Sequence, residues 1–335
     1  MQLPDRPVMS SNVEAADWIR ARLSSPERYI VTSIIPAGFE AYARVLHPAQ
    51  LPEDHHELVR WSEVSRWSGV AMHDHVQWHE IALPRVAPST APPWRSQGPR
   101  AGAPFVNDVT VLVEHLTHAT STPDSCDFGV WSGYLGGAAV MYTSSGAPPE
   151  RLPPPPQPSR LVQLPRRDYA LFQGPLSCAT SFTGVSHRHV ATANLWWPTD
   201  HSWCVASEID LSWTYVGGST ELIRRVLDDE RLEAQPALPG DSSCLNVIGW
   251  LAELIEQTTN QVLASGSASL SLSRGTVQVT WRKPAVLRHG LITSTTTGAN
   301  GVSSGESPVR TRDRDHLRLQ IHHEVQRAVL GLVAA

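Results

Sequence analysis

The sequence predicts an α+β fold, in which a mixed, mainly antiparallel sheet has flanking helices and is followed by a C-terminal helix and hairpin extension. Three observations favour this fold class. Short β-branched or aromatic runs end at proline or glycine, as sheet strands do. Longer segments repeat apolar residues at helical spacing. These segments do not alternate as strict βαβ units, which argues against a wholly parallel sheet.

A core domain is expected over residues 1–240, and its elements follow from local patterns. They are, in order, a helix at 12–23, strands at 29–36 and 40–48, a helix at 61–69, a helix from Asn107 to Leu116, strands at 126–136 and 167–174, a hairpin at 190–211 and a helix at 219–229. The segment 146–160 has seven prolines in fifteen residues. Proline lacks the N–H that a sheet or helix needs, so this segment should be an extended excursion.

Beyond the core, the chain divides into three expected parts. Residues 245–264 carry the longest apolar stripe, and 269–281 alternate on both sides of Arg274-Gly275. These features predict a helix and β-hairpin extension at 241–289. Residues 290–312 are rich in serine, threonine and glycine and should form a flexible linker. The terminal segment 313–335 has helical apolar spacing.

Composition and charge limit the classes of protein to which this chain could belong. A net charge of −5 and a pI near 6.3 predict no nucleic-acid partner. The four cysteines are far apart and form no CxxC, which excludes a zinc ribbon. No apolar run is long enough to span a bilayer, and the N-terminus lacks a signal-peptide core. We therefore expect a cytoplasmic protein with reduced thiols and no membrane partner.

A metal site is predicted at three histidines in the segment MHDHVQWHE, namely His73, His75 and His79. In a strand, the first two share a face and could ligate one ion. The HxH pattern followed by Glu80 resembles the first half of a cupin motif. The glycine and the second half-motif of cupins are missing, so solvated histidines at a helix end are the alternative.

The hairpin around Pro198-Thr199-Asp200-His201 predicts a cluster of ionisable groups. A tight symmetric turn places Trp196 opposite Trp203, an aromatic pair that defines register. Glu208 and Asp210 then share one strand face, with His189 opposite Asp210. A histidine between two carboxylates could serve acid–base catalysis. A solvated polar patch at the end of the hairpin is the alternative.

A ligand site is predicted at the other end of the same stretch. The sequence TYVGGST leads from a strand into a helix, and Gly217, Gly218 and Ser219 could leave backbone N–H groups free for an anion. A plain turn with Ser219 as the N-cap uses the same residues. Trp196 and Trp197 are binding residues if exposed and core residues if buried. Cys204 is expected in the core.

Three motifs resemble a family of hypothetical proteins common in actinobacteria. They are PAGFEAYARVLHPA (36–49), WSEVSRWSG (61–69) and NLWWPTDHSWCVASEIDLSWTYVGGS (194–219). The resemblance covers roughly residues 28–235. The family has no assigned activity, so the resemblance implies no catalytic residues.

Two functions follow as hypotheses. The first is a non-enzymatic protein of regulatory or immunity type that binds a protein partner or a small ligand, since no catalytic signature is complete. The alternative is a hydrolase or other acid–base enzyme using His189, Glu208 and Asp210, with a metal-dependent form using the three histidines. No motif identifies a cofactor or an oligomeric state.

Overall fold

The fold is known from a computed structural model of the chain. It describes residues 6–50, 58–82, 89–90, 92–94, 98–102, 104–135, 140–141, 150–151, 160–182, 192–243, 249–272, 275–282, 290–298 and 301–309, together with Arg318, Ile321 and Val325. Residues 1–47 and 100–244 form one compact unit, and residues 48–99 and 245–335 form another. Residues 48–99 are thus an insertion in the core domain that the sequence predicts as continuous.

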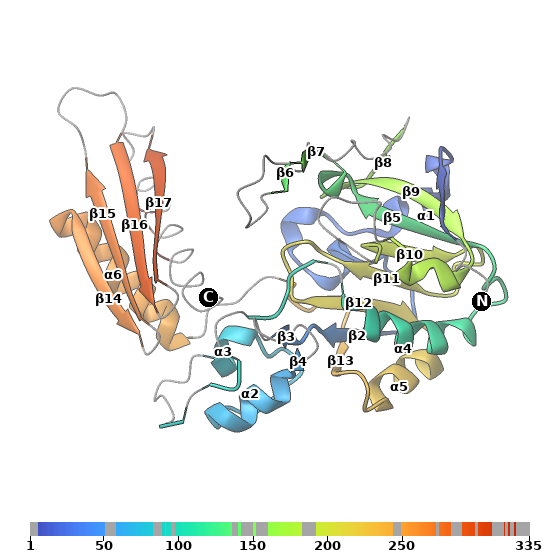
Figure 1. Cartoon of the computed structure of the whole chain (residues 1–335), viewed down its shortest axis with the longest axis horizontal. Helices are drawn as coiled ribbons and strands as arrows, with labels where there is room; N and C mark the ends of the chain where they lie inside the picture. The colour runs from blue at the N-terminus through green and yellow to red at the C-terminus, as the bar shows by residue number, and fades with distance from the viewer. Residues whose placement is uncertain are drawn as a thin grey trace. The chain divides into compact units, whose positions relative to one another are not determined.

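The first unit is built on a nine-stranded antiparallel sheet, which confirms the α+β class. Its order is β1-β9-β5-β10-β11-β12-β2-β13, with β8 paired to β9 (Figure 1). The strands are β1 (Val8–Ser10), β2 (Ala41–Leu46), β5 (Cys126–Trp131), β8 (Val162–Gln163), β9 (Asp168–Gly174), β10 (Leu195–Pro198), β11 (Cys204–Ser207), β12 (Trp213–Gly218) and β13 (Ala234–Ala237).

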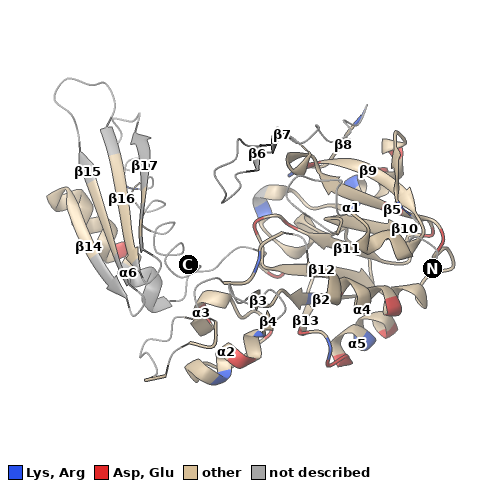
Figure 2. Cartoon of the chain, in the orientation of Figure 1, with Lys and Arg blue, Asp and Glu red and all other residues tan. Residues whose placement is uncertain are grey.

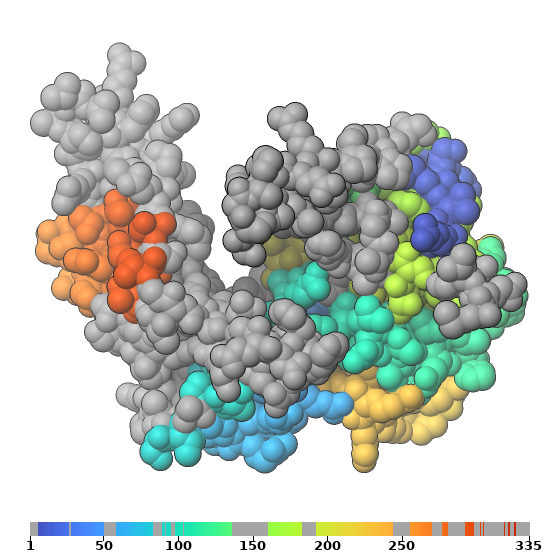
Figure 3. All heavy atoms as spheres, in the orientation of Figure 1, coloured from blue at the N-terminus to red at the C-terminus, as the bar shows by residue number. Residues whose placement is uncertain are grey.

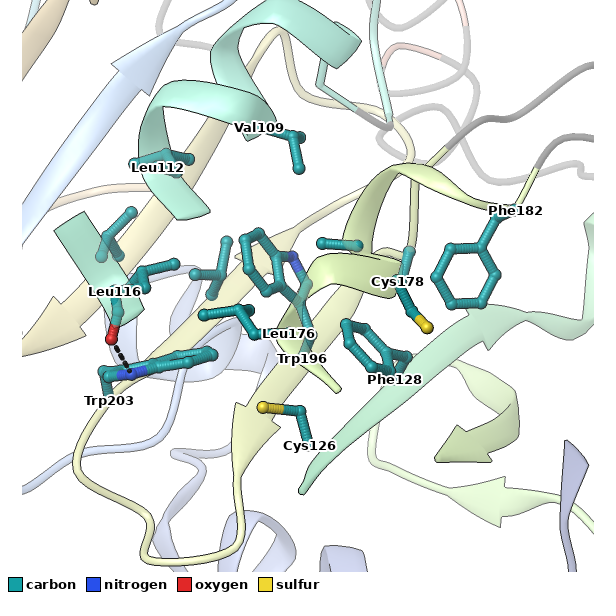
Figure 4. Packing of buried hydrophobic residues seen from close by; sticks show 14 of the residues in the cluster. Val109, Leu112, Leu116, Cys126, Phe128, Leu176, Cys178, Phe182, Trp196 and Trp203 are labelled. Atoms are coloured by element: carbon teal, nitrogen blue, oxygen red, sulfur yellow. Dashed lines mark hydrogen bonds between the residues drawn. The ribbon is translucent and has the colours of Figure 1, made fainter. Parts of the chain in front are cut away.

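Two helices cover one face of this sheet. They are α4 (Val106–Thr117) and α5 (Thr220–Asp228), and Figure 3 shows them adjoining at the surface. Their apolar stripes pack on Trp196, Trp203 and Phe128 together with the short helix η5 (Leu176–Thr180) (Figure 4). The outward sides of α5 carry acidic and basic residues, whereas the strands are largely uncharged (Figure 2). This amphipathic division explains why both helices were predictable.

Short N-terminal elements contact the other face of the sheet. They are η1 (Val13–Ala16), α1 (Asp17–Arg22), η2 (Pro26–Arg28) and η3 (Val31–Ser33). The rings of Trp18 and Trp197 lie 6.3 Å apart, and the Tyr42 hydroxyl donates to the Pro36 carbonyl at 3.1 Å. The strand expected at 29–36 is therefore wrong. Val31, Thr32 and Ile35 are buried, but a left-handed Tyr29 with φ of 49° and the 3-10 turn of η3 interrupt extension.

The register of the β10–β11 hairpin differs from the prediction by two residues. Trp196 pairs with Val205, because the connection is longer than a tight four-residue turn. A shift of two preserves the faces of both strands. The rings of Trp196 and Trp203 therefore still meet edge to face, with centroids 5.6 Å apart.

The insertion contains the short strands β3 (Ala49–Gln50) and β4 (Leu58–Val59) and the helices α2 (Trp61–Ser68) and α3 (Trp78–Ala82). Tryptophan rings hold it together. Trp78 lies between Trp61 and Trp94, at centroid distances of 5.5 and 5.2 Å. Gly69 ends α2 in the left-handed conformation, with φ of 73°, as its position in the sequence indicates.

The C-terminal part contains α6 (Gly249–Ser265) and a four-stranded antiparallel sheet of β14 (Ser267–Leu272), β15 (Gly275–Arg282), β16 (Gly290–Gly298) and β17 (Gly301–Val309). The predicted helix and hairpin are confirmed. The flexible linker at 290–312 is wrong, because β16 and β17 lie within it. Threonine is β-branched and suits a strand even where the overall composition looks like a linker. Arg318, Ile321 and Val325, the described positions of the expected helix at 313–335, are helical.

The proline-rich segment 146–160 also contributes to pairing, contrary to expectation. Within it, β7 (Glu150–Arg151) forms a two-residue antiparallel ladder with β6 (Val140–Met141). Glu150 and Arg151 lie between runs of proline and retain the N–H groups that pairing requires. The remaining short element of the first unit is η4 (Ser132–Tyr134).

Candidate functional site

Glu208 and Asp210 lie in the turn between β11 and β12, not on a strand face. The strand ends at Ser207, so both acidic residues lie beyond the ladder with β12. The Glu208 side chain is buried, with 6 % of its surface exposed, whereas that of Asp210 is 73 % exposed. His189, their predicted partner, lies outside the described residues.

Arg167 joins the two carboxylates, and sequence reasoning missed it. It lies in the turn between β8 and β9, where the Leu164 N–H donates to the Arg167 carbonyl at 3.1 Å. Its Nε and Nη2 donate to Glu208 Oε1 at 2.9 and 2.7 Å. Nη2 also donates to Asp210 Oδ2 at 2.7 Å. The pair Arg166-Arg167 carries no local signal of this role, because its partners are more than forty residues away.

The ion pairs favour the charged form of Arg167. Burial opposes its charged form, but the hydrogen bond and charge of Glu208 and the charge of Asp210 outweigh burial, so the pKa of Arg167 is raised. The guanidinium also lies 5.9 Å from the ring centroid of Trp131, within range of a cation–π contact. Arg167 therefore stays charged and connects two turns of the sheet.

Behind Arg167 is a small cavity of about 20 Å³ between the sheet and the N-terminal segment. Its polar and charged wall residues are Ser33, Arg166, Arg167, Tyr169, Asn194, Ser207 and Glu208. A space of this size has room for about one water molecule. A surface cleft of about 340 Å³ lies next to it and shares Leu164, Arg166 and Arg167. The β8–β9 turn therefore separates an inner cavity from an outer cleft.

Two wall residues of the inner cavity have buried donors that find no hydrogen-bond partner among the residues that the structure describes. Asn194 is 1 % exposed, and its Oδ1 accepts from the Trp131 N–H at 3.0 Å, but its Nδ2 has no partner. Arg166 donates from Nη2 to the Pro26 carbonyl at 2.7 Å, while its buried Nε has no partner. Each unmade bond costs about 1–3 kcal/mol. Because both residues line one cavity, an acceptor that enters it can supply the missing bonds.

Ser207, also on the cavity wall, ends a directed chain of hydrogen bonds. Burial lowers the pKa of His47 to about 4, so its ring is neutral at neutral pH. Its Nδ1 lies 2.9 Å from the Arg100 carbonyl, which only accepts, so Nδ1 carries the proton. Nε2 then accepts from Thr214 at 2.8 Å, and Thr214 accepts from Ser207 at 2.7 Å. The Ser207 hydroxyl therefore donates to Thr214, and the Ser207 oxygen can accept a further hydrogen bond.

The predicted ligand residues have structural roles. Trp196 and Trp197 are each 1 % exposed and belong to the core. A Cβ on Gly217 would come within 2.6 Å of the Phe39 ring, and one on Gly218 within 2.6 Å of Leu222, so glycine permits this packing. The Ser219 hydroxyl caps α5 by accepting from the Leu222 N–H at 3.2 Å, which is the N-cap role predicted for Ser219.

The start of α5 is already occupied by an anion of the chain itself. The Thr220 N–H donates to the Glu40 carboxylate at 2.9 Å. This hydrogen bond lowers the pKa of Glu40. An N–H group of the first turn of α5, next to the predicted Gly217, Gly218 and Ser219, is therefore used by Glu40, as the positive end of the helix dipole favours.

The three histidines do not gather into a metal site. His73 Nε2 lies 3.0 Å from Glu80 Oε2, and its Nδ1 accepts from the His75 N–H at 3.3 Å. His75 is exposed, whereas His79 is buried on α3. Within the described part of the chain, no three His, Cys, Asp or Glu side chains come together as metal ligands would. A turn followed by a helix replaces the strand that would have aligned His73 and His75.

The described thiols are poor nucleophiles. Cys126, Cys178 and Cys204 are buried thiols that form no disulfide among the described residues. Burial raises the pKa of Cys126 to about 12, with a smaller contribution from the charge of Asp127, and burial also raises the pKa of Cys204. Reactivity requires the thiolate, which these raised pKa values disfavour. Cys204 is fully buried and is a core residue, as predicted.

Comparison with protein-family models, curated proteins and solved structures found no significant match. The resemblance to an actinobacterial family therefore stays a prediction. Within the residues that the structure describes, no helix is both long and apolar enough to cross a bilayer.

Proposed function

We propose that this chain is a non-enzymatic protein that binds a small ligand in the cavity and cleft around Arg167. The observation that carries the proposal is the pair of buried, unpartnered donors, Asn194 Nδ2 and Arg166 Nε, on the wall of one cavity. Their combined cost is about 2–6 kcal/mol, a large part of the stability of an ordinary domain. A ligand that accepts from both groups would recover this free energy on binding.

The surroundings of the carboxylates favour binding over acid–base catalysis. A general base needs a lone pair directed at its substrate. Glu208 Oε1 instead accepts from Arg167 and from the Ile209 N–H at 3.0 Å, and Asp210 also accepts from Arg167. The adjacent cleft of about 340 Å³ lies within the range of small-molecule sites. Both features support a preformed recognition site.

The test converts one donor to an acceptor without changing its shape. Asn194→Asp keeps the oxygen that accepts from Trp131 but replaces Nδ2 with oxygen. Asn12→Asp makes the same change at an exposed residue and is the matched control. A library of small polar metabolites is screened by thermal shift against the wild type and both variants. We expect at least one compound to stabilise the wild type and Asn12→Asp but not Asn194→Asp.

Two results would contradict the proposal. One is that no compound stabilises the wild type. The other is that every stabilising compound acts equally on Asn194→Asp, which would place binding away from the cavity.

A further inference from the structure

We infer that the ligand of this cavity carries an oxyanion, a carboxylate or a phosphate group, which binds Arg166 and Arg167 and displaces Asp210. This inference rests on the proposed function and specifies the chemical class of the ligand. It follows from the type of the unpartnered groups, from the charge of the wall and from the unequal exposure of the two carboxylates.

The unpartnered groups define the polarity of the ligand. The amide Nδ2 of Asn194 and the Nε of Arg166 are donors that cannot accept. A ligand group that satisfies both must present oxygen lone pairs. A carboxylate or phosphate offers several in one compact group, and a charged acceptor strengthens each bond. An ammonium group, which only donates, would leave both donors unpartnered.

The wall of the inner cavity has a surplus of positive charge. Arg166 and Arg167 face one carboxylate there, that of Glu208. Among the described residues, Arg166 pairs with no carboxylate and instead contacts the Pro26 carbonyl and the Tyr29 ring, 4.7 Å from its centroid. Its guanidinium therefore retains a full charge for a ligand. Guanidinium groups also match the planar, two-oxygen geometry of a carboxylate or phosphate.

Asp210 occupies a position that a ligand oxyanion could take. It accepts from Arg167 Nη2, the same atom that donates to Glu208. Glu208 is buried and adds the second bond to Nε, so it holds the guanidinium in place. The Asp210 side chain is 73 % exposed. Its carboxylate is hydrated by solvent when it leaves Arg167, so breaking this ion pair costs little free energy. Asp210 is thus a competitor, built into the chain, for an external anion.

The sizes of the two spaces agree with this arrangement. About 20 Å³ is too small for a whole ligand, and even for a carboxylate without some outward movement of the Arg167 side chain. Loss of the Asp210 contact would permit that movement. The adjoining cleft, lined by Trp131, Ser132 and Asp168 as well as the two arginines, would then hold the rest of the molecule.

The experiment measures binding of acetate, inorganic phosphate and neutral acetamide to the full-length chain by titration calorimetry. Acetate and phosphate distinguish the two oxyanion classes, and acetamide tests the need for charge. Three variants are compared with the wild type. Arg166→Gln removes the free charge, Asp210→Asn removes the competitor, and Arg224→Gln changes an exposed arginine of α5 as the matched control.

We expect saturable binding of acetate or phosphate and weaker binding of acetamide. Arg166→Gln should weaken oxyanion binding about tenfold, as loss of a charged hydrogen bond does. Asp210→Asn should tighten it about threefold, an effect that a mere loss of structure could not produce. Arg224→Gln should bind as the wild type does.

Other outcomes separate the two proposals. If neutral compounds bind and Asn194→Asp abolishes this, while no oxyanion binds, the inference is wrong and the ligand-binding function stands. Oxyanion binding that is equally weakened by Arg166→Gln and Arg224→Gln indicates surface charge alone and overturns the inference. If neither oxyanions nor library compounds bind, the cavity holds only water, and both proposals fail.

Discussion

At the scale of single residues, two tryptophans of one hairpin differ in a single hydrogen bond. Trp203 Nε1 donates to the Leu116 carbonyl at 3.1 Å, whereas the buried Trp196 Nε1 has no partner (Figure 4). Both rings fill the same core, so replacement by phenylalanine removes similar volumes. We expect Trp203→Phe to lower the free energy of unfolding by about 1–2 kcal/mol more than Trp196→Phe. Urea unfolding of both variants provides the measurement, and equal losses would show that the bond contributes nothing.

His47 should make stability depend on pH. An unfolded histidine binds its proton near pH 6.5, whereas burial keeps folded His47 neutral down to about pH 4. Between these values the unfolded chain binds more protons, so the free energy of unfolding falls as pH falls, by about 3 kcal/mol in total. Urea midpoints measured from pH 7 to pH 4 test this. In His47→Gln this part of the slope should vanish, and an unchanged slope would refute the assignment.

At the scale of elements, Arg167 links the β8–β9 turn to the β11–β12 turn. Arg167→Met would leave the buried Glu208 carboxylate without its partner, and we expect a loss of about 3–5 kcal/mol in the free energy of unfolding. Asp210→Asn should cost less than about 1 kcal/mol, because its side chain is exposed. Denaturant unfolding compares the two variants. Similar losses would mean that the contacts of Arg167 with Glu208 add little to its contact with Asp210.

Among the elements, the helices could be predicted from the sequence, whereas the link between the turns could not. The apolar stripes of α4 and α5 repeat every three to four residues, and Leu112 and Leu222 are buried as that spacing requires. The role of Arg167 was not predictable, because an ion pair between two turns leaves no periodic trace. The predicted register of the β10–β11 hairpin was wrong for a related reason. Loop length sets register, and a proline followed by polar residues fits several lengths.

The candidate site was predictable only in part. Glu208 and Asp210 were identified as neighbours in the sequence, and the structure places both on one guanidinium. Asn194 gave no signal, because its significance lies in a missing partner. Only the packing of the sheet against the N-terminal segment makes Nδ2 a buried donor.

At the scale of the whole molecule, residues 48–99 form an insertion whose two ends meet. His47 Nδ1 donates to the Arg100 carbonyl at 2.9 Å, so the chain leaves the first unit and returns to it at adjacent points. Insertions between adjacent points are tolerated because they leave the host backbone in place. The core of the first unit should therefore fold when a short linker replaces the insertion.

Replacing residues 49–98 by a short Gly/Ser linker tests this independence. We expect the first unit to keep a cooperative urea transition, because its sheet and its helices α4 and α5 come from residues outside the insertion. The fall in stability between pH 6.5 and pH 4 should also persist, because His47 and its partners Arg100 and Thr214 all remain. This slope distinguishes a native first unit from a merely collapsed one. A variant with a cooperative transition but no slope would have lost the His47–Arg100 bond, and the insertion would then be required to close the ends of the host.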